Sequence, residues 1–145
     1  MVPMVRATLW LAMSAIAVPP PPAAPPGSAE PHPEPATLAV DGGAIQVVVP
    51  GALAGPARTA LLAFVERSAH AVGAWYGRFP AAALRIDVSV TDGAKIGPGT
   101  TWPGTPPHLA LGVGARIDRA GYDRDWVLVH ELIHLAFPPV ADRHH

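Results

Sequence analysis

The clearest pattern in the chain is an alternation of apolar and polar residues over residues 84–91. The apolar positions are Leu84, Ile86, Val88 and Val90, and the polar positions are Arg85, Asp87, Ser89 and Thr91. A period of two places the apolar side chains on one face of an extended segment and the polar side chains on the other. The segment is therefore predicted to be a half-buried β-strand.

Shorter apolar runs predict further strands. Residues 37–40 and 44–49 flank an Asp41-Gly42 pair, and such a pair between two apolar runs is typical of a β-hairpin. Residues 109–113 are predicted to form another short strand.

The long segment before that strand, residues 92–108, is rich in Gly, Pro and Thr and is predicted to be a loop. Trp102 lies in the middle of it. This side chain is expected to anchor the loop in the core, with a wall of a substrate cleft as the alternative. His108, at the end of the segment, is a weaker candidate for a residue that lines such a cleft.

Apolar residues at three- and four-residue spacing predict a helix over residues 57–76. They are Leu61, Phe64, Val65, Val72, Trp75 and Tyr76. Gly77 and Pro80 follow and are expected to end the helix. His70 falls within it, on a face that is expected to be partly exposed.

A second helix is predicted to begin near Asp123 or Asp125, because aspartate caps helix N-termini and suits their positive end. Pro138 and Pro139 are expected to end it, since proline cannot continue a helix. Residues 115–122, before the helix, are expected to be a polar connection. The element order β, β, α, β, β, α indicates the α+β class, with a small mixed or antiparallel sheet.

The N-terminal region is typical of an exported protein. Residues 1–18 combine a charged start, a short apolar run and a small-residue exit, which together predict a secretory signal peptide; the alternative is a buried N-terminal helix. Proline-rich residues 19–36 are expected to form an extended tether. The folded domain is then residues 37–145, and the protein is expected to be secreted or otherwise extracytoplasmic.

Composition excludes several classes of function. The 145 residues carry 10 Lys and Arg against 11 Asp and Glu, so a basic nucleic-acid-binding surface is excluded. The chain has no cysteine, which rules out disulfides, thiolate metal sites and Cys-linked lipid anchors. The apolar run of the signal peptide is shorter than the roughly 20 residues that span a bilayer, so no stable membrane span is expected.

The second predicted helix contains an H-E-x-x-H motif, His130-Glu131-Leu132-Ile133-His134. Histidines four residues apart lie one above the other on a helix, so His130 and His134 can bind the same metal ion. Zinc binds neutral imidazole at about 2.0–2.1 Å and prefers four ligands. Glu131 lies beside them and can take a proton from a zinc-bound water molecule, which makes that water a nucleophile at neutral pH.

The rest of this helix is apolar nearly all round, which predicts a buried helix. Imidazole and carboxylate groups on a buried helix need a partner, because burial without one costs several kcal/mol. A metal ion supplies that partner. The alternative is a hydrogen-bonded His/Glu cluster that holds no metal.

Residues 125–138 resemble the active-site helix of gluzincin-type metallopeptidases, in particular the secreted peptidase MA-like group. The resemblance implies a partial zincin-like domain, in which an edge strand above the active-site helix aligns a peptide or protein substrate. Residues 109–113 would be that strand. It further implies zinc as the cofactor, His130 and His134 as zinc ligands, and Glu131 as the general base for peptide-bond hydrolysis.

The chain departs from the family pattern in two places. Related aminopeptidases carry a glutamate on the edge strand, and residues 108–114 contain no acid, so aminopeptidase specificity is not expected. Gluzincins take a third zinc ligand from a glutamate on a later helix, and no glutamate follows Glu131. The chain is therefore expected to be a truncated piece, with Asp142, His144 and His145 as the downstream candidates for a local third ligand. The alternative is a non-catalytic exported domain with a degenerate or metal-binding zincin fold.

Overall fold

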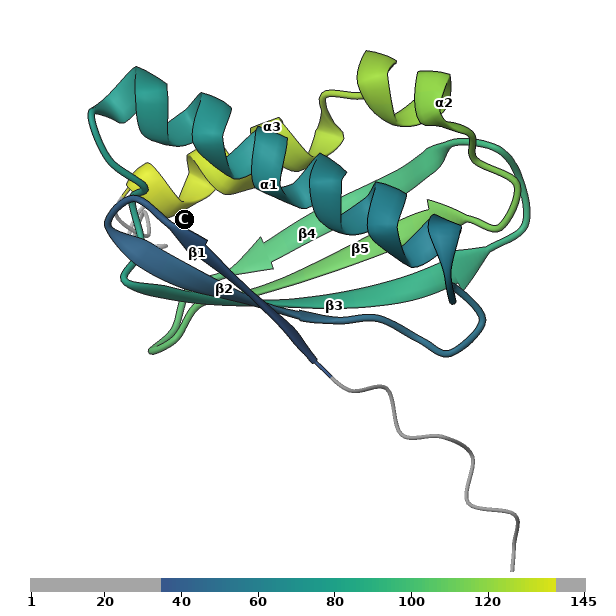
Figure 1. Cartoon of the computed structure of the whole chain (residues 1–145). Helices are drawn as coiled ribbons and strands as arrows, with labels where there is room; N and C mark the ends of the chain where they lie inside the picture. Colours follow the sequence, from purple (N-terminus) through teal and green to yellow (C-terminus); the bar gives the residue numbers. More distant parts are fainter. Residues whose placement is uncertain (1–34, 138–145) are drawn as a thin grey trace, which may run out of the picture.

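Five β-strands form one mixed sheet, and the helices of residues 35–137, the part that this computed structural model describes, lie on one face of it (Figure 1). The elements are β1 (Ala36–Val40), β2 (Gly43–Val48), α1 (Pro56–Tyr76), β3 (Ala83–Thr91), β4 (Ile96–Trp102), β5 (His108–Gly114), α2 (Arg119–Arg124), α3 (Val127–Ile133) and the 3₁₀ turn η1 (His134–Ala136). The strand order across the sheet is β1-β2-β3-β5-β4. The predicted α+β class is confirmed, and the sheet is of the mixed kind.

Both ends of the chain lie outside the described residues. The predicted signal peptide, most of the predicted tether and the candidate ligands Asp142, His144 and His145 belong to these ends. Within residues 35–137, no helix is long and apolar enough to cross a membrane.

The predicted hairpin is present. β1 and β2 pair antiparallel, with Leu38 opposite Ile45, and the turn between them places Gly42 at a φ of 92°. Glycine adopts this left-handed conformation without steric cost, which is why the Asp-Gly pair directs the chain back on itself here.

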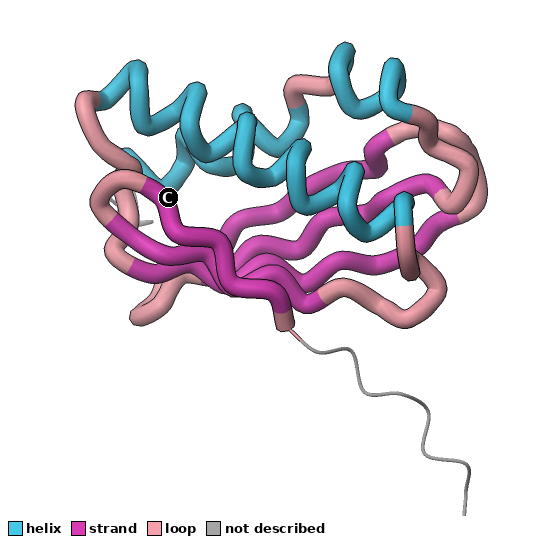
Figure 2. Tube along the Cα trace, in the orientation of Figure 1, coloured by secondary structure: helices cyan, strands magenta, loops and turns pink. Residues whose placement is uncertain are grey.

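α1 connects the parallel strands β2 and β3 and runs across the sheet (Figure 2). Four residues of its predicted apolar stripe are buried: Leu61, Phe64, Val65 and Val72. The prediction is wrong for Trp75 and Tyr76, which are 83% and 40% exposed. At 3.6 residues per turn these two share the face of Val72. The last turn of α1 therefore extends past the elements that cover the rest of the stripe.

The centre of the sheet is formed by the parallel strands β3 and β5, and its apolar side chains face the helices. Ile86 and Leu109 are opposite each other in the register and are both fully buried. Arg85 and Asp87 alternate with these residues, as predicted, and therefore project from the face of the sheet that the helices leave open.

The edge of the sheet differs from the prediction. Residues 92–108 are not one loop, because β4 occupies their centre and pairs antiparallel with β5. β5 is consequently an interior strand, and the expectation that residues 109–113 form the edge strand is wrong. β4 contains Gly97, Pro98 and Gly99 and has an irregular register between Ile96 and Gly99. An edge strand tolerates such residues, since one side of it needs no ladder hydrogen bonds.

The C-terminal part forms two helices where one was predicted. Asp118 caps α2 by accepting a hydrogen bond from the Gly121 amide at 2.7 Å, so residues 115–122 are not simply a connection. Asp125 has an extended backbone that separates α2 from α3, and its carboxylate accepts a hydrogen bond from the Val127 amide at 2.8 Å. Asp125 thus precedes the start of α3 and bonds its first residue, but the N-cap position is Trp126, and Asp123 lies inside α2.

Candidate metal centre

α3 and the 3₁₀ turn that continues it bring three candidate metal ligands together. His130, Glu131 and His134 each offer a ligand atom, and these atoms all lie within 4.8 Å of one another. The Nε2 atoms of the two histidines are 3.3 Å apart. The four-residue spacing accounts for this, because it places both imidazoles on one side of the same helical segment.

The separation between the two imidazole nitrogens fits a shared metal ion. Two ligands at about 2.0–2.1 Å from a tetrahedral zinc ion are about 3.3–3.4 Å apart, which is the edge of the coordination tetrahedron. The observed 3.3 Å matches that edge. The same distance also allows a hydrogen bond between the two rings, which is the metal-free alternative. The donor set is therefore compatible with zinc, which binds neutral imidazole and carboxylate oxygen.

The burial of the three residues differs from the prediction of a helix buried on all sides. Leu128, Glu131 and Leu132 are buried against α1 and β4, whereas His130 and His134 are exposed. The helix therefore has one inner face and one outer face. The glutamate carboxylate enters the candidate site from the inner face, and the imidazoles enter it from the solvent side.

Aromatic contacts support the orientation of the imidazoles. The Trp126 ring, one turn before His130, meets the His130 ring edge-on with centroids 5.2 Å apart. The His130 and His134 rings are also nearly perpendicular, at 86° and 4.9 Å. These contacts restrict rotation of His130, which has one neighbouring ring on each side along the helix.

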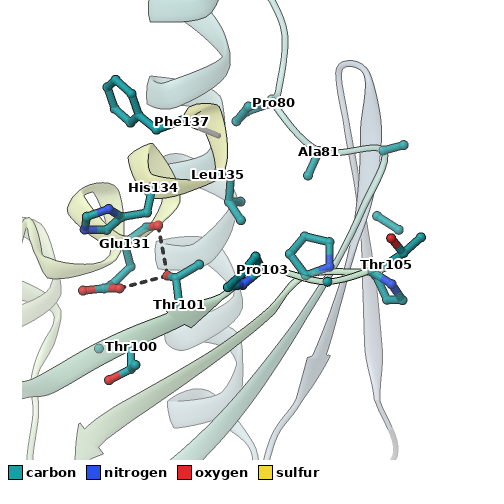
Figure 3. Close-up of a pocket in the computed structure, with 16 residues that line it drawn as sticks. Pro80, Ala81, Thr100, Thr101, Pro103, Thr105, Glu131, His134, Leu135 and Phe137 are labelled. Carbon is teal, nitrogen blue, oxygen red and sulfur yellow. Dashed lines mark hydrogen bonds between the residues drawn. The ribbon is translucent and has the colours of Figure 1, made fainter. Parts of the chain in front are cut away.

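Two residues of β4 contact Glu131. The Thr101 hydroxyl lies 2.8 Å from Oε2 of Glu131 and 3.1 Å from its backbone carbonyl oxygen (Figure 3). Gly99 lies on the same side of β4, where a Cβ atom would come within 2.5 Å of the Glu131 Cγ. The absence of a side chain at Gly99 thus leaves the space in which the glutamate lies.

The sequence analysis missed Thr101 and Gly99 because both fall in the segment that it assigned to a loop. Residues 99 and 101 share a face only once the segment is extended. Glycine and proline at positions 97–99 concealed that strand, and no local pattern indicates that it would lie beside a helix 30 residues further along the chain.

A cavity of about 850 Å³ opens beside Glu131 and His134 (Figure 3). Glu131 and His134 lie on one side of it, and small or apolar residues make up much of the remaining wall, among them Ala81, Pro103 and Leu135. Glu131 and His134 are the ionisable residues among those that line it. The cavity therefore suits an uncharged group placed next to the metal position.

His108 and Trp102 were candidates for residues that line a substrate cleft, but neither lines this cavity. The Nε2 of His108 lies 2.6 Å from Oδ2 of Asp87, on the open face of the sheet. Trp102 is 46% exposed and stacks on the His108 ring at a centroid distance of 5.3 Å, so it anchors nothing in the core. Trp102 is exposed because it lies on a strand, where successive side chains point to opposite faces. Thr101 faces α3, so Trp102 points away from it.

A charged pair adjoins His108. The Arg85 guanidinium donates two hydrogen bonds to Asp87, at 2.8 and 3.0 Å. These bonds, together with the contact from His108, hold the pKa of the Asp87 carboxyl below its usual value against a smaller opposing effect of burial. His70 is exposed on α1, with its Nε2 4.0 Å from Glu66.

Within residues 35–137, the group around the metal position consists of His130, Glu131 and His134. Comparison with protein-family models, with curated proteins and with solved structures gives no match for this chain. The family resemblance therefore rests on the helix motif, and the chemistry of the site has to be argued from its geometry.

Proposed function

We propose that this chain is a zinc-dependent peptidase domain in which His130 and His134 bind the metal and Glu131 is the general base for peptide-bond hydrolysis. The observation that carries the proposal is the 3.3 Å separation of the two imidazole Nε2 atoms, which matches two ligands of one tetrahedral ion. Zinc, when bound, would polarise the substrate carbonyl and lower the pKa of the attacking water.

Glu131 favours a catalytic site over one that only binds metal. A general base must lie within hydrogen-bond reach of the proton that it takes and must be held in that position. Glu131 is 9% exposed, and its Oε2 is bonded to Thr101. A binding site built from the two histidines alone would not require a carboxylate beside them.

β4 is the strand that aligns the substrate in this proposal. It forms the edge of the sheet and contacts α3, so an extended peptide can pair with its free edge as an added strand. The cavity beside Glu131 and His134 would then take an uncharged side chain of the peptide. The position of the edge strand β4 beside the motif helix α3 supports the interpretation of the domain as zincin-like.

The proposal has two further parts that rest on sequence. The signal-like residues 1–18 and the proline-rich segment after them favour a secreted or extracytoplasmic protein that acts on peptides or proteins outside the cytoplasm. Catalytic zinc sites use three protein ligands and water, so a third ligand would come from outside residues 35–137.

The test combines zinc stoichiometry with hydrolysis of a labelled unfolded protein such as casein by the 145-residue chain. His130→Ala and His134→Ala should lose the bound zinc and the activity. Glu131→Gln should keep zinc and lose at least a hundredfold in rate, since it removes a base and no imidazole. His70→Ala is the matched control, because His70 is exposed on another helix. Full activity in Glu131→Gln would overturn the proposed role of the glutamate.

A second candidate is a non-catalytic metal-binding domain of the same fold. It is favoured by the fact that two imidazoles, and no third, meet at this position within the described residues. It predicts that the chain binds zinc through His130 and His134 and cleaves no peptide. The hydrolysis assay therefore separates the two candidates.

A further inference from the structure

We propose that Thr101 is the positioning residue for Glu131: its hydroxyl, with the space left by Gly99, holds the carboxylate in the geometry that proton transfer requires. The inference rests on the proposed function, because it concerns the base of the same site. It adds a residue of β4 to a site that the motif places entirely on the helix.

The hydrogen bonds of Thr101 join the strand to the helix at the reacting residue. The Thr101 Oγ1 is 2.8 Å from Oε2 of Glu131 and 3.1 Å from the Glu131 carbonyl oxygen. Both partners can only accept, so the single hydroxyl hydrogen is donated toward them, and the carboxylate is the closer acceptor. A hydrogen bond to an ionised group is about twice as strong as a neutral one.

The same contact leaves one carboxylate oxygen for chemistry. Thr101 bonds Oε2 of Glu131, so we assign Oε1 as the oxygen that takes the proton from the attacking water. That proton moves from water oxygen to Oε1 while the water oxygen bonds to the carbonyl carbon, and it is then available for the leaving amine. Thr101 gives up no proton in this sequence and acts only by orienting the carboxylate.

Gly99, two residues before Thr101 on the same face of β4, completes the arrangement. A Cβ at this position would lie 2.5 Å from the Glu131 Cγ and 3.1 Å from its Cδ, and real Cβ atoms do not approach that closely. The Gly99 backbone does not have the positive φ that disfavours other residues. An alanine here would therefore act by displacing Glu131 and not by straining the strand.

The carbonyl contact explains why a threonine on β4 can hold this part of the helix. α3 ends at Ile133 and continues as the 3₁₀ turn η1, so the Glu131 carbonyl lies where the hydrogen-bonding pattern of the helix changes. Thr101 thus fixes the backbone and the side chain of the same residue. A displacement of about 1 Å in a catalytic group can cost about a hundredfold in rate.

The test compares Thr101→Val, which removes the hydroxyl at nearly constant shape, with Thr101→Ser, which keeps it. Thr101→Val should lower kcat at least tenfold with little change in KM, and its zinc dissociation constant should stay within about twofold of wild type. Thr101→Ser should retain kcat within about threefold. Thr37→Val is the matched control, an exposed strand threonine on β1 at the opposite edge of the sheet.

A second pair of variants keeps the Thr101 hydroxyl and adds a methyl group to a glycine of β4, either beside Glu131 or away from it. Gly99→Ala should lower kcat as Thr101→Val does. Gly97→Ala should not, because its Cβ would meet Gly112 Cα at an ordinary 3.5 Å. This pair decides the inference if Thr101→Val does not fold.

A readout that needs no activity is the position of the Glu131 carboxylate in crystals of the metal-free variants. It should move by about 1 Å or more in Thr101→Val and stay in Thr101→Ser. An unmoved carboxylate together with unchanged kcat in Thr101→Val would overturn the inference and leave the proposed function standing. If the wild-type chain hydrolyses no peptide, the proposed function fails, and the positioning role is then decided by the position of the Glu131 carboxylate alone.

Discussion

The Nε2 atoms of His130 and His134 lie 3.3 Å apart, and both residues are exposed to solvent. The helix, the edge-on contact with Trp126 and the perpendicular packing of the two rings account for the arrangement. Preorganisation of this kind lowers the entropic cost of binding a metal, because the imidazoles lose little freedom when the ion arrives.

Zinc should therefore stabilise the fold. A ligand that binds only the native state adds about 2.7 kcal/mol at a free concentration a hundred times Kd. For a domain of this size we expect Tm to rise by at least about 5 °C under those conditions. The measurement is calorimetry with and without zinc, and His134→Ala should abolish the rise while His70→Ala keeps it. An equal rise in His134→Ala would place the zinc elsewhere.

Acid should weaken the fold partly through Asp87. Arg85 and His108 hold the pKa of Asp87 below the value of about 3.9 expected in the unfolded chain. The unfolded state then binds more protons between the two pKa values, so this contribution is present above about pH 4 and is lost as the pH falls through the lower folded value. Urea unfolding from pH 6 to 2 should show a smaller acid loss in Asp87→Asn than in wild type.

Arg85→Gln provides the complementary measurement, because the Arg85 hydrogen bonds are the largest cause of the lowered Asp87 pKa. It should reduce the acid dependence of unfolding in the same way as Asp87→Asn. If the double variant of Asp87 and Arg85 lost the sum of the two single reductions in acid dependence, the result would contradict a direct interaction between the two residues.

The hydroxyl of Tyr122 is buried and has no hydrogen-bond partner among residues 35–137, while its ring packs on Phe64 at a centroid distance of 5.2 Å. Burial also raises the pKa of Tyr122. Because an unsatisfied buried hydroxyl costs about 1–3 kcal/mol, Tyr122→Phe should leave the free energy of unfolding unchanged or increase it. Chemical denaturation measures this, and a loss of more than about 1 kcal/mol would mean that the hydroxyl has a partner in solution.

Leu128 holds α3 in place, since it is fully buried in the core. Leu128→Ala should lower the free energy of unfolding by about 2–5 kcal/mol through lost burial and a residual cavity. Trp75→Ala, at a larger but 83% exposed side chain, should change it by less than about 0.5 kcal/mol. Equal effects of the two substitutions in urea unfolding would contradict the packing of the helices described above.

Elements with local signals could be predicted. The alternation in β3, the Asp-Gly turn of the first hairpin and the stripe of α1 up to Val72 all follow from periods within a few residues. The prediction that the apolar stripe is buried was wrong at Trp75, because the exposure of a residue at a helix end depends on how far the neighbouring elements extend. The C-terminal helix was predicted as one, although Asp118, which caps α2, and Asp125, which separates α2 from α3, are present in the sequence.

The sequence by itself determined the central pair of the candidate site. His130 and His134 are four residues apart, and helical geometry alone brings their nitrogens together. Only the tertiary structure decided which strand lies beside them. β4 is rich in glycine and proline and forms by pairing with β5, a non-local interaction that no local pattern encodes. The contacts of Thr101 and Gly99 with Glu131 join residues about 30 positions apart, so they exist only once that strand has been placed against α3.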